Sequence, residues 1–237
     1  MSYGDACAYK WGIGPAAEQN LLVGVSKHHH ILKDGTIRWQ KSPLNPRLPG
    51  KRYLRRMVLF DCGTGDFYGE CCAEDEPKDI IGFLARAWIA KPDHPMKGVP
   101  GTLNVPTAVR TDSEYAAQLR WLQSRVPFAV GEIPSGFAAG VHVTRLFEGA
   151  IGDLRVSADI EDVVVTLELA QACSALITGR ISRSNRYRID DPWAKVMPPP
   201  ASFIEAVDQL YEPRGGWRMA PFDMIVDGAP RTDRARA

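Results

Sequence analysis

The apolar residues in the first third of the chain follow the two-residue period of β-strands. Residues 21–31 begin with LLVGVS, and the Asp34-Gly35 turn predicts a hairpin that returns through residues 36–39. Residues 53–60 (YLRRMVLF) and 66–72 (DFYGECC) are joined by DCGTGD, which is typical of a hairpin turn. The pattern therefore predicts a three-strand antiparallel meander built from residues 21–39 and 53–72.

Helical periodicity begins after this meander. Between residues 75 and 91 apolar side chains recur every 3.6 residues, and the acids and proline of Asp75-Glu76-Pro77 suit a first helical turn. A loop rich in proline and glycine then leads to a predicted strand at residues 107–111 (TAVRT), which ends at Asp112. The remaining predicted elements are a helix at 113–124, a short strand at 128–130, and helices at 144–154, 159–176 and 200–211.

The order of these elements predicts an α/β fold. We expect a ribonuclease-H-like mixed sheet, in which the three-strand antiparallel meander is extended by parallel strands and flanked by helices. Because a helix separates the meander from residues 107–111, that strand is expected to return parallel to the first one. The predicted domains are an N-terminal extension at residues 1–20, the core at 21–180, and a partly disordered C-terminal extension at 181–237.

The composition is that of an ordinary globular protein. Apolar residues make up 45% of the 237 positions and charged residues 24%, and no apolar run approaches the ~20 residues of a membrane span. The first residues lack the basic and apolar regions of a secretory signal, so we expect a cytoplasmic protein without a membrane partner. The five cysteines include no CxxC pair, which argues against a disulfide framework and a zinc site.

Positive charge is concentrated in one segment, although the net charge is only +1. Residues 33–56 hold eight basic residues and a single acid, Asp34. Such a segment binds phosphate backbones even on a nearly neutral protein, while a solvated basic loop remains the alternative. Trp39 and Tyr53 in the same segment are suited to base stacking. The residues expected to bind nucleic acid are Lys33, Arg38, Lys51, Arg52, Arg55 and Arg56.

Three segments resemble the catalytic core of the integrases and transposases in the retroviral-integrase superfamily. YLRRMVLFDCGTGDFYGECCA (residues 53–73) is similar to the second and third strands of that core. VPTAVRTDSEY (105–115) resembles the segment with the second catalytic aspartate, and FAAGVHVTRLFEGAIGDL (137–154) the loop and helix with the catalytic glutamate. The resemblance implies DNA as the partner and phosphoryl transfer with two Mg²⁺ ions held by three carboxylates.

The same resemblance singles out the candidate catalytic residues. It places Asp112 at the second acidic position, and 35 residues (113 to 147) separate Asp112 from Glu148, a spacing that many family members share. Aligning the helix itself puts Thr144 at the third position, one turn before Glu148 on the same face. Asp112 and Glu148 are the expected metal ligands. Asp61, after the second strand, completes the catalytic set, with Asp34 as the alternative.

Structural interpretations of these residues stay open. Asp112 suits a helix N-cap, Glu148 an exposed helix acid, and Asp61 a turn residue. The predicted first strand contains no acid and reads KHHHI at its centre, so one of the histidines at 28–30 would stand at the first metal position. Imidazole is a poor Mg²⁺ ligand, and for this reason we expect no Mg²⁺-dependent nicking.

The sequence therefore predicts a degenerate, transposase-derived protein that binds DNA, has an incomplete metal site and plays an accessory role. A partner protein is a second expected partner. Mg²⁺ is the expected cofactor only if the protein is active, and otherwise none is expected. One alternative is an active Mg²⁺-dependent nuclease or strand transferase, which a nicking assay would reveal. The other is a structural or interaction subunit without nucleic acid, which would lack salt-dependent DNA binding.

Overall fold

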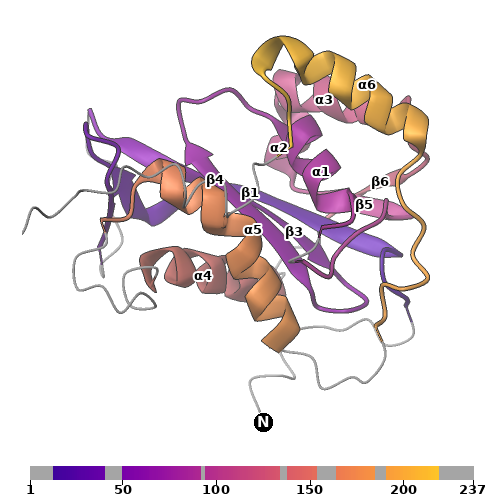
Figure 1. The fold of residues 1–237 in the computed structure, drawn as a ribbon, viewed down its shortest axis with the longest axis horizontal. Coiled ribbons are helices and arrows are strands. Elements are labelled where there is room, and N and C mark those ends of the chain that lie inside the picture. Colours follow the sequence, from indigo (N-terminus) through magenta and orange to yellow (C-terminus); the bar gives the residue numbers. More distant parts are fainter. Residues whose placement is uncertain are drawn as a thin grey trace, which may run out of the picture.

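A mixed β-sheet forms the centre of the molecule (Figure 1). The computed structural model describes residues 13–40, 50–91, 94–133, 138–153, 164–184 and 191–218. The strands in these ranges are β1 (Glu18–Ile31), β2 (Ile37–Trp39), β3 (Arg52–Asp61), β4 (Phe67–Ala73), β5 (Thr102–Val105) and β6 (Ala129–Glu132). Their order across the sheet is β4-β3-β1-β5-β6, and β2 pairs with one end of β1.

The strand directions divide the sheet into two parts. β1, β3 and β4 are antiparallel neighbours, whereas β5 and β6 run parallel to β1. β1 pairs with β5 only at Glu18, Gln19 and Asn20, and with β2 only from His29 to Ile31. Between these two pairings, residues 21–28 of β1 have no neighbouring strand on that side among the described residues. The middle of a long central strand is therefore an open edge.

Helices cover both faces of the sheet, and each face has its own apolar core (Figure 1). Side chains alternate along β3, so that Met57 and Leu59 point to one face and Val58 and Phe60 to the other. The first face packs against α1 (Ile80–Trp88), α3 (Ser113–Gln123) and α6 (Ala201–Tyr211). The second face packs against α4 (Ala138–Asp153) and α5 (Leu167–Ser184). The molecule is thus an α/β protein with a mixed sheet between two helical layers.

Most of the predicted elements are present. The meander corresponds to β1, β3 and β4, the Asp34-Gly35 turn joins β1 to β2, and α3, β6 and α6 lie where the sequence pattern places them. α4 begins at Ala138, before the predicted residue 144, and α5 begins at Leu167 instead of residue 159. Residues 159–163 of that predicted helix lie outside the described residues.

The predicted strand at residues 107–111 is wrong. These residues form the short helix α2 (Thr107–Thr111), and the strand that runs parallel to β1 is β5, which ends at Val105. Pro106 explains the error, because a proline disfavours helical backbone in the preceding residue and is itself suited to the start of a helix. The carboxyl end of the parallel strand is therefore Val105-Pro106 and not Asp112.

The segments flanking the sheet also differ from expectation. α1 begins at Ile80, because the Asp79 carboxylate accepts the Gly82 N–H at 2.9 Å and caps the helix there. The described part of the C-terminal segment, residues 191–218, buries Trp193 and Phe203 in the core beside α1. An η2 turn (Glu212–Arg214) follows α6. The predicted disordered tail after residue 218 lies outside the described residues.

Candidate functional site

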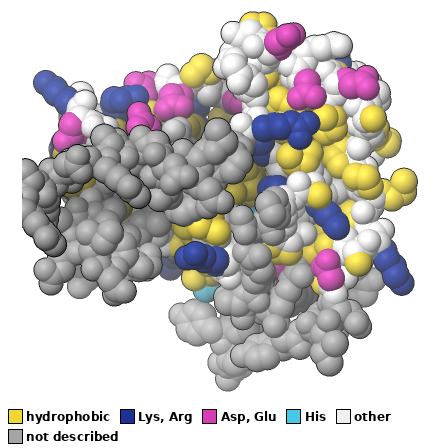
Figure 2. All heavy atoms as spheres, in the orientation of Figure 1, with side chains coloured by type: hydrophobic (Ala, Val, Ile, Leu, Met, Phe, Trp, Pro, Cys, Tyr) yellow, Lys and Arg dark blue, Asp and Glu magenta, His cyan; other side chains and the backbone are white. Residues whose placement is uncertain are grey.

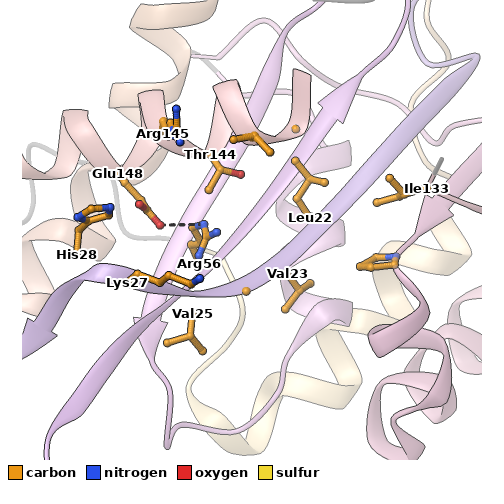
Figure 3. A pocket seen from close by; sticks show the side chains of 14 residues that line it. Leu22, Val23, Val25, Lys27, His28, Arg56, Ile133, Thr144, Arg145 and Glu148 are labelled. Carbon is orange, nitrogen blue, oxygen red and sulfur yellow. Dashed lines mark ion pairs between the residues drawn. The ribbon is translucent and has the colours of Figure 1, made fainter. Parts of the chain in front are cut away.

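A cleft of about 490 Å³ opens between β1, α4 and the carboxyl ends of β5 and β6 (Figure 3). It lies along the open edge of β1, which supplies Leu22, Gly24 and Val25 to its wall. Pro106 follows β5 and Ile133 follows β6 in the chain, and both line the opposite side. The cleft exists because β1 is much longer than β5 and α4 crosses the gap left beyond the end of β5.

The most buried charged groups of the cleft are Arg56 of β3 and Glu148 of α4. Arg56 lies opposite Gly24 in the β1–β3 register, and a Cβ at Gly24 would lie 3.3 Å from Arg56 Nη1. The missing side chain lets the guanidinium lie across β1 and reach α4, where its Nε is 3.0 Å from Glu148 Oε1. Figure 3 shows this ion pair spanning the cleft between strand and helix. Burial lowers the pKa of Arg56, and the Glu148 charge opposes this shift.

The ion pair leaves hydrogen-bonding capacity unused. Arg56 Nη1 and Glu148 Oε1 are buried and have no hydrogen-bond partner among the described residues, so the 3.0 Å approach of Arg56 Nε to Glu148 Oε1 is an ion pair without hydrogen-bond alignment. The Glu148 side chain is 9% exposed and that of Arg56 is 21% exposed. The expectation of an exposed helix acid at position 148 is therefore wrong.

Two further cations and an imidazole surround this pair. Lys27 of β1 and Arg145 of α4 are exposed and line the cleft, as does the half-buried His28. His28 Nδ1 lies 3.0 Å from the Gln40 carbonyl oxygen, a contact that orients the ring. Among the described residues lining the cleft, the charged groups are thus three cations and the single carboxylate of Glu148. This arrangement favours an anionic ligand.

Asp61 lies away from the cleft and has a structural role. It is fully buried at the end of β3, where its carboxylate accepts the backbone N–H groups of Ala16, Gly63 and Thr64 at 2.8 to 3.1 Å. The Thr64 hydroxyl donates to Asp61 Oδ1, the oxygen that also accepts the Gly63 and Thr64 N–H groups. Burial raises the pKa of Asp61 to about 6. The turn interpretation of Asp61 accounts for the contacts with Gly63 and Thr64, whereas the contact with Ala16 joins this turn to the segment before β1.

Asp112 caps α3 and lies in the helical layer formed by α1, α3 and α6. Its carboxylate accepts the backbone N–H groups of Glu114 and Tyr115 and forms an ion pair with Lys78. The hydrogen bond from Lys78 holds the pKa of Asp112 below its usual range. The structure therefore places Asp112 with Lys78 and α3, whereas Glu148 lies with Arg56 on the α4 side. The two acids do not share a site.

The donor set of the cleft does not fit a pair of Mg²⁺ ions. Two-metal sites use several carboxylates to offset the repulsion between the cations, but the only carboxylate lining the described cleft is already paired with a guanidinium. In the described ranges no group of three or more His, Cys, Asp or Glu side chains is placed to hold a metal ion. Thr144 lines the cleft one turn before Glu148, as the helical spacing predicts.

The predicted nucleic-acid-binding residues fall into two groups. Lys33, Arg38 and Lys51 are exposed, around the end of the sheet formed by β1 and β2. The other three have partners within the protein. Arg52 donates to Asp75, Arg55 is buried and donates to the Glu76 carbonyl oxygen at 3.0 Å, and Arg56 is paired with Glu148. Lys41 and Arg47 lie outside the described residues.

The other two histidines of the triple-histidine run, His29 and His30, do not line the cleft. His29 Nδ1 lies 3.0 Å from Ser26 Oγ, and His30 is buried. Burial lowers the pKa of His30, and the nearby charges of Lys51 and Arg38 lower it further. Only His28 of the three lines the cleft.

Among the described side chains on the face seen in Figure 2, basic and acidic groups are interspersed. In the described residues, none of the helices combines the length and hydropathy of a membrane span. A comparison with protein-family models finds no match, and a comparison with curated proteins finds no similar sequence.

Proposed function

We propose that this protein binds nucleic acid in the cleft between β1 and α4, on a ribonuclease-H-like scaffold with an incomplete metal site. In this proposal it acts as an accessory protein of transposase or integrase descent. Two parallel strands extend an antiparallel meander from the side of its first strand, β1, as expected for that scaffold. The cleft lies beyond the carboxyl ends of the parallel strands, where open α/β sheets generally bind their ligands.

The observation that carries the proposal is the charge of the cleft. Lys27, Arg56 and Arg145 converge on a space that one ion-paired carboxylate lines. Lysine and arginine contacts to phosphate provide most of the affinity of proteins for nucleic acid backbones. The two exposed cations, Lys27 and Arg145, are the proposed phosphate contacts.

The proposed incomplete metal site is supported by the described cleft lining at the strand ends, near which an integrase core would carry its acids. Leu22 and Gly24 of β1 line the cleft, and Pro106 stands at the end of β5. Glu148 is the one acid among the described residues that line the cleft, and it is paired with Arg56. In the proposal the guanidinium supplies a fixed positive charge, so that phosphate binding does not depend on Mg²⁺.

The experiment is a fluorescence anisotropy titration of labelled single-stranded and duplex DNA in EDTA, at several KCl concentrations. Replacing both Lys27 and Arg145 by Ala should weaken binding. It should also reduce the slope of log K against log salt by about 1.4 for a single strand, because each lost phosphate contact contributes about 0.7. A nicking assay with Mg²⁺ on the same samples tests the active-nuclease alternative.

A matched control removes two exposed cations outside the cleft. Arg120 is exposed on α3 in the opposite helical layer, and Lys195 is exposed within the C-terminal segment. R120A/K195A has the same net charge as K27A/R145A and should retain the wild-type salt slope. Equal losses of DNA affinity and of salt slope in the two double variants would contradict binding in the cleft. Absence of any salt-dependent binding would favour the interaction-subunit alternative.

A further inference from the structure

The cleft combines a cationic rim with an apolar wall, and the two parts suit different portions of one ligand. Leu22 and Val25 of β1, together with Pro106, Ile133 and Val141, form the apolar lining. Val141 is 55% exposed although it lies beside the cleft, so this apolar surface is accessible. A phosphate group alone would use only the cations and would leave the apolar wall uncovered.

The volume of the cleft limits what it can contain. About 490 Å³ lies within the range of small-molecule sites and is too small to enclose a duplex. Proteins that extract a single base from a strand hold it between apolar or aromatic side chains and hydrogen-bond its edge. His28 adds an oriented imidazole to the lining, and histidine is among the side chains that stack on unpaired bases.

Arg56 and Glu148 give the cleft both a donor and an acceptor. Each nucleobase presents donors and acceptors side by side on its pairing edge, so a base can accept from a guanidinium and donate to a carboxylate at once. Arg56 Nη1 and Glu148 Oε1 are themselves buried, so these contacts fall to the other atoms of the two side chains, which carry their 21% and 9% exposure. The partial exposure of both side chains brings the charged groups to the cleft surface.

We infer that the cleft receives one unpaired nucleotide of a single strand. Its base lies against the apolar wall with its edge toward Arg56 and Glu148, and its phosphate lies at Lys27 and Arg145. This inference rests on the proposed nucleic-acid function and specifies its substrate as a single strand with an exposed base. Duplex DNA, whose bases are paired and stacked, is the poorer ligand.

The test compares two single-stranded oligonucleotides of equal length and charge, one with normal bases and one with a tract of abasic sites. Wild-type protein should bind the normal strand at least about fivefold more tightly, which is the lower end of the effect of one stacked base. Both strands should show the same salt slope, because their phosphates are identical. The normal strand should also bind more tightly than a duplex of the same sequence.

A variant locates the effect in the cleft. Gly24→Val places a side chain against the Arg56 guanidinium, from which even a Cβ would be only 3.3 Å away, and should abolish the preference for normal bases. Gly149→Val is the control, because a Cβ at Gly149 of α4 meets nothing within 4 Å, and it should keep the preference. Equal affinity of wild type for normal and abasic strands, or tighter binding of duplex, overturns this inference alone. Absence of binding to any of them overturns the proposed function as well.

Discussion

The Arg56–Glu148 ion pair makes a prediction about stability that does not depend on any ligand. The perturbation is a double-mutant cycle of Arg56→Met, Glu148→Leu and the combined variant. Each single substitution leaves a buried charge without its partner, whereas the double substitution removes both charges and leaves apolar side chains of similar length. We expect both single variants to be destabilised and the double variant to be close to wild type.

The magnitude follows from the burial of the two groups. Removing one member of a buried ion pair costs about 3–5 kcal/mol in other proteins. Arg56 is 21% exposed and reaches water through the cleft, so about 2–4 kcal/mol is expected here. Burial lowers the pKa of Arg56 even though the Glu148 charge raises it. The attraction between the two charges therefore does not fully offset the free-energy cost of removing Arg56 from water. The double variant should therefore lie within about 1 kcal/mol of wild type or be more stable.

The assay is urea denaturation at pH 7, followed by tryptophan fluorescence, with the coupling free energy taken from the four proteins. A coupling of about 2 kcal/mol or more is predicted from the expected single and double effects. The same cycle on Arg110 and Glu132, an exposed pair 3.5 Å apart, should give a coupling near zero. Additive effects at Arg56 and Glu148 would refute the reasoning, because Glu148 would then be available for another role, including metal binding.

Two further predictions concern the segment around Asp61. Its pKa of about 6, raised by burial, lies above the ordinary 3.8, so its contribution to stability is full below about pH 4 and is lost as pH rises through 6. Asp61→Asn should flatten the dependence of the free energy of unfolding on pH over that window. It should also destabilise the protein by about 1–3 kcal/mol, because hydrogen-bond acceptors are lost. An unchanged pH dependence would contradict the raised pKa of Asp61. Gly63→Ala should lower the melting temperature markedly, because its Cβ would overlap the Gly14 carbonyl oxygen. Gly14→Ala should not, because a Cβ there meets nothing within 4 Å. Equal melting temperatures of these two alanine variants would show that the close approach is absent.

Much of the fold could be predicted from the sequence, because its strands carry strong local signals. The apolar run of β3 and the Asp34-Gly35 turn each identify their own element without reference to the rest of the chain. β5 was missed since its four residues lie inside a stretch rich in proline and glycine. The β-branched residues that follow Pro106 favoured a strand there, but the proline begins a helix. Local propensity could not separate these two assignments.

The candidate site was predictable only in part. The resemblance singled out Glu148 by its 35-residue separation from Asp112 and Thr144 by alignment of the helix. Helical spacing placed the two residues on one face, and both line the cleft. The predicted grouping of Asp112 with Glu148 assumed that residues 107–111 form the parallel strand and end it at Asp112. Because these residues form a short helix instead, Asp112 lies beside Lys78. Lys27 and Arg145 were not singled out, because nothing local distinguishes them from other surface cations. Lys27 and Arg145 line the same cleft only because α4 packs across β1 in the folded protein.

The most direct test of the central claim is to find where nucleic acid contacts the protein. A single-stranded oligonucleotide containing 5-iodouridine is irradiated with the wild-type protein in EDTA, and the crosslinked peptides are identified by mass spectrometry. We predict crosslinks in the peptides of β1 around His28 and of α4 around Thr144, and their loss in K27A/R145A. Crosslinks confined to α3 or α6, in the opposite helical layer, or crosslinks that require Mg²⁺, would contradict metal-independent binding in the cleft.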